Sequence, residues 1–279
     1  MIRWRVDAGD IRGASRILLG NDKLAPLNEE TKTALQATHP KGPTPSVSEL
    51  QAASPLRLTE GQIRKAAYEM TSASAPGRDG LRISHVQQML GKRGGENSTR
   101  LSKALDAFAE LCIAGKVSKS IRPHFYGARL VALSKKDGGL RHIAVGLTLC
   151  RLVGKACCIS LREKAKAVLQ PHQLGVGVPG GTEAAAHATR LFLTNSGKGL
   201  VKLVFRNAFN ELDRSVLINA VDRLIPELGL FVRSCYVEPS TLDLDGHTIL
   251  SQRGVQQGDP FGPLLFAIGI KQLSSASRC

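Results

Sequence analysis

The apolar residues of this chain form short runs whose spacing changes repeatedly between the period of a helix and that of a strand. The helical period predicts helices over residues 101–114, 149–169, 182–194, 214–225 and 262–273. The strand pattern predicts strands over residues 128–133, 140–145 and 200–205, the last of them buried, and a hairpin around Asp-Gly within 241–250. Helices and strands alternate without the regular order of a parallel α/β fold. The pattern therefore predicts an α+β fold in which helices pack on an antiparallel sheet.

A segment rich in Pro, Gly, Thr and Ser, from His39 to Ser46, has the composition of a linker. Before it, Asp10 can cap a short helix that carries Ile11, Ala14 and Leu18 on one side. We expect residues 1–55 to form a helical N-terminal extension with this linker, and residues 56–279 to form the main domain.

Composition excludes several classes of protein. The longest apolar stretches are too short to span a bilayer, and the first five residues have no apolar signal-peptide core. The six cysteines lack the spacing of metal or redox motifs and are expected to be small buried apolar groups. We therefore expect an intracellular protein, of the cytoplasm or nucleus, without membrane association.

The charge of the chain favours a polyanionic partner. The 279 residues include 38 Lys and Arg against 23 Asp and Glu, a formal net charge of +15. Residues 101–200 hold 15 basic and 5 acidic side chains, whereas residues 201–250 hold 5 basic and 7 acidic ones. This distribution is typical of a surface that binds RNA or DNA. A solvated basic face is the alternative interpretation.

Two segments carry candidate chemistry. Lys135, Lys136 and Arg141 flank a Gly-Gly turn, where they can clamp a phosphate or simply face solvent. In the segment 254–263, glycines flank two glutamines and allow the backbone to approach a ligand closely. Asp259 precedes a Pro and is expected to cap the final helix.

Three segments, Lys135–Ile143, Lys202–Asn210 and Gly254–Pro263, occur in an order that resembles the reverse transcriptase domain, most closely that of non-LTR (LINE-type) retrotransposons. The loop Ser74–Leu81 resembles the segment that opens the fingers of that domain. The resemblance extends from about residue 60 onward. It implies an RNA-directed DNA polymerase, a nucleotidyltransferase, with part of a right-hand fold: fingers over about 60–198 and an incomplete palm over about 199–279.

The resemblance also implies roles for individual residues. Lys135 and Arg141 match the residues that hold the triphosphate of the incoming nucleotide. Phe209 matches the bulky side chain that favours deoxynucleotides, and Gln257 and Gly258 match a loop that touches nucleotide and template. The implied partner is an RNA or DNA primer–template, with Mg²⁺ as the cofactor of the family and no small-molecule cofactor; the oligomeric state is left open.

The sequence departs from this family at its metal site. Val204 occupies the position of the first metal-binding Asp, and the sequence contains no Asp-Asp pair for the Tyr-x-Asp-Asp turn. Because two-metal catalysis needs carboxylate ligands, no catalytic residue or metal ligand is intact. We regard Asp213, Asp222, Asp243 and Asp245 as poor substitutes because none lies on the strand of Val204.

These observations favour a C-terminally truncated, inactive copy of a reverse transcriptase. The main alternative is a non-catalytic nucleic-acid-binding module derived from the same fold. An enzyme completed by a longer or second chain and a structural helical protein agree less well with the sequence.

Overall fold

The computed structural model describes residues 23–48, 53–135, 138–194 and 199–276, together with Gly197 and four isolated positions before residue 23. The helix expected around Ile11 lies largely outside this part of the chain. The strands are β1 (Lys23–Leu24), β2 (Ala128–Ser134), β3 (Leu140–Gly146), β4 (Ser240–Leu244) and β5 (His247–Ser251). The helices before β2 are α3 (Glu29–Ala37), α4 (Gln62–Glu69), α5 (Ile83–Met89), the 3-10 helix η1 (Lys92–Gly94), α6 (Gly95–Ile113) and α7 (Arg122–Phe125). Those after β3 are α8 (Thr148–Ser160), α9 (Arg162–Leu169), α10 (Gly181–Leu193), α11 (Ala208–Glu211), α12 (Arg214–Leu224), the 3-10 helix η2 (Pro226–Leu228), α13 (Gly229–Tyr236) and α14 (Gly262–Ala276).

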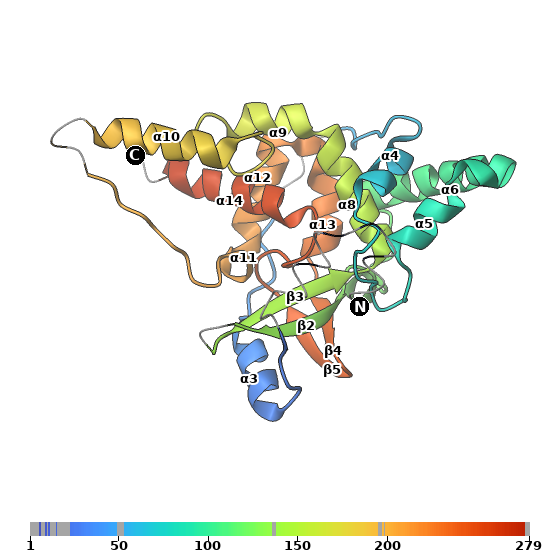
Figure 1. Ribbon diagram of the computed structural model, residues 1–279, viewed down its shortest axis with the longest axis horizontal. Helices are drawn as coiled ribbons and strands as arrows, with labels where there is room; N and C mark the ends of the chain where they lie inside the picture. Colours follow the sequence, from blue (N-terminus) through green and yellow to red (C-terminus); the bar gives the residue numbers. More distant parts are fainter. Residues whose placement is uncertain are drawn as a thin grey trace.

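The sheet is built around β2, and the helices lie mainly on one side of it (Figure 1). β3 pairs antiparallel with β2 along its whole length, with Ala128 opposite Gly146 and Ser134 opposite Leu140. The other edge of β2 pairs with β1 near Ser134 and with β4 near Ala128. The β2–β4 pair is parallel, so the sheet is mixed and the expectation of an antiparallel sheet was wrong in this respect. A long helical connection separates the two strands in sequence, which is what a parallel pair requires.

The hairpin predicted around Asp-Gly is confirmed. β4 and β5 pair antiparallel, and Leu244 lies opposite His247. Asp245 and Gly246 have φ angles of 49° and 86°. Positive φ at both central residues is the geometry of a two-residue type I′ turn, whose twist matches that of the flanking strands.

Most predicted helices are confirmed, with small changes at their ends. The expected helix over 149–169 is divided at Leu161 into α8 and α9. In α12, Asp213 caps the helix by accepting hydrogen bonds from the backbone N–H of Ser215 and Val216, at 2.7 and 3.2 Å. This side chain satisfies two N–H groups that the helix cannot bond internally.

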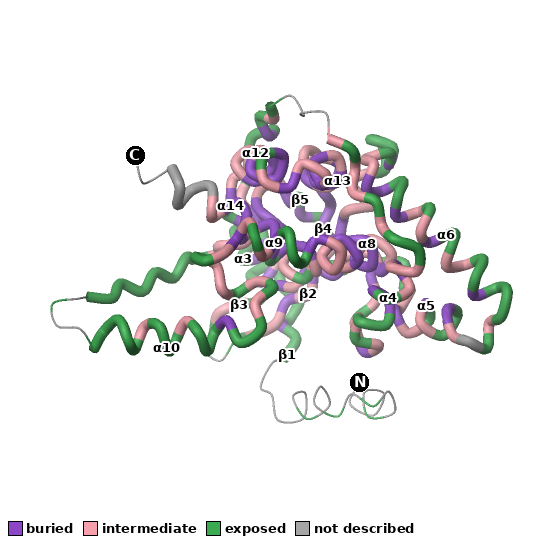
Figure 2. The backbone as a smooth tube through the Cα atoms, turned by 90° about the horizontal axis from the view of Figure 1, so that it is seen from above, coloured by how far each residue is buried: buried purple, intermediate pink, exposed green. Residues whose placement is uncertain are grey.

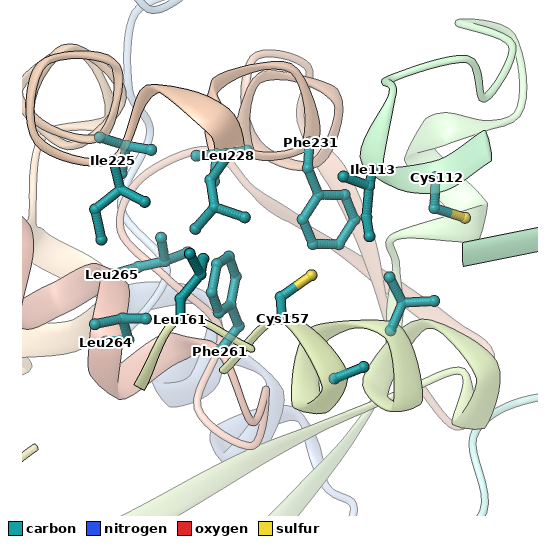
Figure 3. Close-up of a cluster of buried hydrophobic side chains, with 14 of the residues drawn as sticks. Cys112, Ile113, Cys157, Leu161, Ile225, Leu228, Phe231, Phe261, Leu264 and Leu265 are labelled. Atoms are coloured by element: carbon teal, nitrogen blue, oxygen red, sulfur yellow. The ribbon is translucent and has the colours of Figure 1, made fainter. Parts of the chain in front are cut away.

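The main hydrophobic core lies among the helices rather than against the sheet (Figure 3). Its largest fully buried members include Ile113, Leu152, Leu217 and Leu228. Burying a side chain of this size contributes about 1.5–3 kcal/mol each. Figure 2 shows that the buried residues are concentrated in the central body, whereas α10 is almost entirely exposed. A smaller core covers the other face of the sheet, where Leu35 of α3 packs with Leu130 and Leu242.

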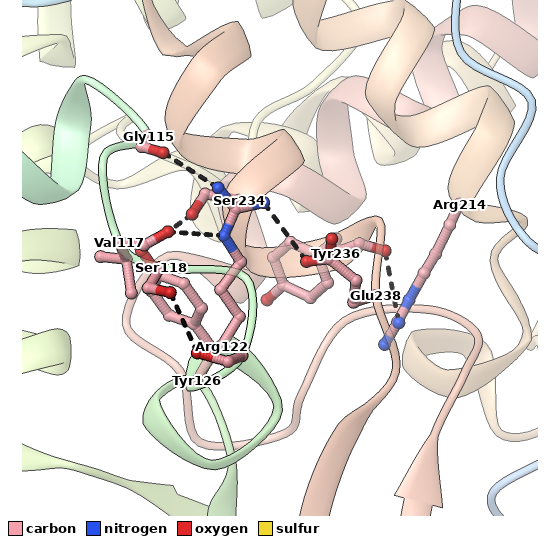
Figure 4. Close-up of polar contacts among 10 residues, drawn as sticks. Gly115, Val117, Ser118, Arg122, Tyr126, Arg214, Ser234, Tyr236 and Glu238 are labelled. Carbon is pink, nitrogen blue, oxygen red and sulfur yellow. Dashed lines mark hydrogen bonds and ion pairs between the residues drawn. The ribbon is translucent and has the colours of Figure 1, made fainter.

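A half-buried arginine, Arg122, and a buried one, Arg214, help to hold the body together by donating to carbonyl oxygens (Figure 4). Arg122 donates to the oxygens of Val117 and Gly115, at 2.9 and 3.0 Å. Arg214 donates to the oxygen of Gly254 at 3.1 Å and lies over the ring of Tyr236, 5.2 Å from its centroid. Burial lowers the pKa of Arg214 to about 10. Such groups are stable only because carbonyls and a ring replace the lost water.

The expectation of a buried strand over 200–205 was wrong. The segment is drawn out between α10 and α11, and within the described residues it has no strand partner (Figure 1). Leu203 is 73% exposed and Val204 81% exposed. An apolar run favours extended backbone, but a strand forms only where a neighbouring strand accepts its hydrogen bonds.

Candidate nucleic-acid interface

The cations of the β2–β3 hairpin lie on its accessible surface. Arg141 is exposed and lies opposite Leu133 in the register. Lys135 is also exposed, and its backbone N–H donates to the carbonyl oxygen of Gly139 at 2.7 Å. The antiparallel pairing predicted for this hairpin is confirmed, whereas Lys136 lies outside the described residues.

The loop that contains Gln257 and Gly258 packs directly on β3. The backbone N–H of Ala144 donates to the carbonyl oxygen of Gln257 at 2.6 Å. Gly258 has a φ of 119°, and a Cβ built on it would lie 2.4 Å from the carbonyl oxygen of Ala144. Only glycine fits this approach. The fold thus brings Gln257 and Gly258 beside the strand that carries Arg141.

Phe209 lies on the other side of the same loop. The N–H of Val255 donates to its carbonyl oxygen at 2.8 Å, and a Cβ on Gly254 would lie 1.9 Å from that oxygen. The ring of Phe209 stacks on Phe266 of α14, with centroids 4.8 Å apart and an interplanar angle of 17°. The loop 254–258 therefore joins α11 to β3, while the ring of Phe209 packs on a helix.

Next to this loop lies a cavity that the sequence does not predict. Its polar lining includes Arg151, Tyr236, Gln256 and Asp259, among aromatic side chains. The hydroxyl of Tyr236 donates to Oδ2 of Asp259 at 3.0 Å, and the N–H of Phe261 donates to Oδ1 at 2.9 Å. Burial raises the pKa of Asp259. Asp259 thus bonds the turn just before α14 rather than the helix itself, which begins at Gly262, and it also bonds a side chain from α13.

Arg151 is the residue that sequence reasoning missed most clearly at this cavity. It is buried, and its guanidinium donates to the oxygen of Ala75 at 2.6 Å and to the hydroxyl of Thr148 at 3.2 Å. Its charge stabilises the nearby Asp259 carboxylate. The available signal was a cation within the apolar pattern of the 149–169 helix, because an unpaired charge is costly on a buried face.

Arg78, in the loop that resembles the opening of the fingers, has a structural position. Its guanidinium donates to the carbonyl oxygens of Ala128 and Thr241, at 3.1 and 2.6 Å. These residues belong to β2 and β4 at the point where the two strands run parallel. Arg78 therefore bridges the only strand pair of the described sheet that is parallel.

The carboxylates considered as metal ligands have other partners. Asp213 caps α12, Asp222 pairs with Arg233 at 2.5 Å, and Asp243 accepts from the N–H of Gly246 at 3.1 Å. Asp245 occupies the exposed hairpin turn. Within the described part of the chain, no group of three or more His, Cys, Asp or Glu side chains is placed to share a metal ion. Since Val204 offers no oxygen either, these residues do not fit the paired Mg²⁺ ions that the resemblance implies.

Among the described helices, none combines the length and apolar character needed to cross a membrane. No protein-family model matches the chain. The chain is similar to the retrotransposable element SLACS 132 kDa protein of Trypanosoma brucei gambiense, with 28% identity over 213 residues. The matched region is 73% of this chain but only 17% of that protein, so the chain spans less than a fifth of its relative. This distant similarity relates the chain to a retrotransposon protein.

Proposed function

We propose that this chain is a nucleic-acid-binding module derived from the reverse transcriptase domain of a retrotransposon, and that it does not extend a primer by itself. The similarity to a retrotransposon protein supports the origin. The excess of basic side chains over residues 101–200 supports a polyanionic ligand.

The observation that carries the proposal is the 2.6 Å hydrogen bond from the N–H of Ala144 to the carbonyl oxygen of Gln257. It holds a glycine-containing loop against the strand on which Arg141 is exposed. Arg141 and Lys135 supply cations for phosphates, and Gly258 is exposed and has no side chain of its own to shield its backbone. Such contacts to a nucleic-acid backbone give affinity with little sequence preference.

The proposed lack of catalysis rests on the oxygen ligands that the described residues can offer to metal ions. In-line attack by a primer hydroxyl needs two metal ions held by carboxylates. Val204 has no oxygen to offer, and Asp213, Asp222 and Asp243 are occupied by a helix cap, an ion pair and a turn.

Binding can be tested by fluorescence anisotropy with a labelled RNA–DNA primer–template between about 50 and 200 mM salt. We expect affinity to fall steeply with salt, and Arg141→Ala to weaken binding about fivefold and to reduce the log–log salt slope by about one. Arg93→Ala removes the same charge from another exposed position and is the matched control, expected to have a smaller effect. Affinity that does not change with salt would refute the proposed electrostatic interface.

Catalysis is tested separately, by extension of the same primer with Mg²⁺ or Mn²⁺. We expect no product. Extension by protein free of contaminating polymerase would overturn the proposed loss of activity while leaving the binding surface intact.

A further inference from the structure

One part of the molecule projects from the body without being covered by it. This arm consists of α10 and the drawn-out segment 199–206 (Figures 1 and 2). In α10 the only buried residue is Gly181. The arm nevertheless carries large apolar side chains that are between 46% and 81% exposed: Leu191, Leu193, Leu200, Val201, Leu203, Val204 and Phe205. Soluble monomers rarely expose so many large apolar side chains together, and such groupings usually mark an interaction site.

The segment has the properties of an edge strand that lacks its neighbour. Six consecutive residues, Leu200 to Phe205, are exposed and include no Pro, Gly or acidic residue. Within the described residues, no strand pairs with them. Unpaired backbone of this composition is a template for pairing with another strand.

The alternation of side chains along this segment indicates which residues would share each face of a strand. In an extended conformation, Val201, Leu203 and Phe205 share one face, and Leu200, Lys202 and Val204 share the other. One face is thus wholly apolar, whereas the other contains a cation. A neighbouring strand in the same sheet has to extend the apolar face without placing a cation opposite Lys202.

We propose that the arm is a self-association surface, in which the 200–206 segments of two copies pair antiparallel with Leu203 opposite Leu203. In this register Val201 of each copy lies opposite Phe205 of the other, so that six apolar side chains form one continuous face. Lys202 lies opposite Val204, and Arg206 opposite Leu200, so no cations face each other directly. The register that places Lys202 opposite Lys202 brings like charges together and is disfavoured.

The exposed apolar area suits a weak, reversible dimer. At the usual area coefficient, complete burial of all seven Leu, Val and Phe side chains of the arm would remove at most on the order of 400–800 Å² per copy from water, and pairing of the 200–206 segments alone buries less than this. Stable interfaces bury about 800 Å² per partner. A two-fold pair uses the same surface on both copies, as closed dimers do. The chain's net charge of +15 opposes association, so the dimer should strengthen as salt screens it. Nucleic-acid binding has the opposite salt dependence, which separates this inference from the proposed function.

The register can be tested by cysteine cross-linking of nucleic-acid-free protein in a Cys279→Ser background. Leu203→Cys places two thiols directly opposite each other across the two-fold axis, at a Cα separation that suits a disulfide. Val204→Cys places its thiol opposite Lys202 and is the matched control. We expect Leu203→Cys to form a covalent dimer at least about tenfold faster under mild oxidation. Equal rates for the two variants would overturn the register and with it the proposal.

Sedimentation velocity of the unmodified chain provides the second measurement. We expect a monomer–dimer equilibrium that shifts towards dimer between about 100 and 500 mM salt. Leu203→Asp places two carboxylates opposite each other and should abolish the dimer. A chain that stays monomeric at about 100 µM in high salt, or that associates only with a different protein, would refute self-association.

Discussion

The ring centroids of His39 and His142 lie 4.7 Å apart in the interior of the protein, and the planes of the two imidazoles are tilted by 58° relative to each other. His142 belongs to β3, next to Arg141, and His39 follows α3. An amide N–H of Asn210 meets Nε2 of His142 at 2.8 Å, and the same amide donates to the oxygen of Thr38. This contact therefore joins the N-terminal segment, the sheet and α11 through side chains that are buried in their neutral form.

Stability should fall when these histidines are protonated. Burial lowers the pKa of His142 to about 4 from an ordinary value of 6.5, and burial also lowers the pKa of His39. The unfolded chain then binds more protons than the folded chain, so the free energy of unfolding decreases as pH falls below 6.5. We expect a loss of up to about 3 kcal/mol between pH 6.5 and 4, measured by urea denaturation.

The matched control for this pH dependence is an exposed histidine. His142→Gln should flatten the decrease between pH 6.5 and 4, whereas His172→Gln, at an exposed position, should leave it unchanged. Equal pH profiles for the wild type and His142→Gln would show that other groups control acid stability.

Arg78 gives a prediction about the sheet. Arg78→Met keeps the length of the side chain but removes its donors to Ala128 and Thr241. Leaving two carbonyl oxygens without these bonds should lower the free energy of unfolding by about 2–4 kcal/mol. Chemical denaturation measures the loss, and Arg129→Met, at an exposed position of β2, should cost much less. Similar losses for the two variants would contradict the bridging role of Arg78.

The sequence predicted elements that depend on local interactions. The Asp245–Gly246 turn and the β2–β3 hairpin follow from turn residues between apolar runs, and both are present. The parallel pairing of β2 with β4 was not predicted because it joins segments about one hundred residues apart, and a local pattern carries no information on such pairs.

The predictions from sequence failed mainly where the burial of a segment depends on residues distant in the chain. The segment 200–205 has a strand-like composition, but its burial depends on a neighbouring strand, and Val204 is exposed. Sequence reasoning treated Asp259 as a helix cap. Its hydrogen bond with Tyr236 and its electrostatic interaction with Arg151 arise only when α13 and α8 pack around the cavity. The roles of Lys135, Arg141, Phe209, Gln257 and Gly258 in nucleotide binding stay predictions.

The close approach of the loop 254–258 to α11 can be tested with two glycines. Gly254 and Gly138 both have positive φ, but only at Gly254 would a Cβ meet another atom, the carbonyl oxygen of Phe209 at 1.9 Å. Gly138→Ala should cost about 1–2 kcal/mol for its backbone conformation alone. Gly254→Ala should cost several kcal/mol, because the loop also has to move. Thermal or chemical denaturation compares the two, and equal costs would mean that the loop is not tightly packed.

Val204→Asp tests both the exposed position of the segment and its proposed pairing. Because Val204 is 81% exposed, the new carboxylate remains solvated, and the free energy of unfolding should change by no more than about 0.5 kcal/mol. A buried Val would instead lose several kcal/mol on this substitution. In the proposed dimer, Asp at 204 faces Lys202 of the second copy twice, so self-association should strengthen about two- to fivefold. Thermal denaturation and sedimentation measure these effects, and Val204→Thr is the uncharged control. A large drop in melting temperature would show that the segment is packed in solution, and weakened association would show that Lys202 does not lie opposite this position.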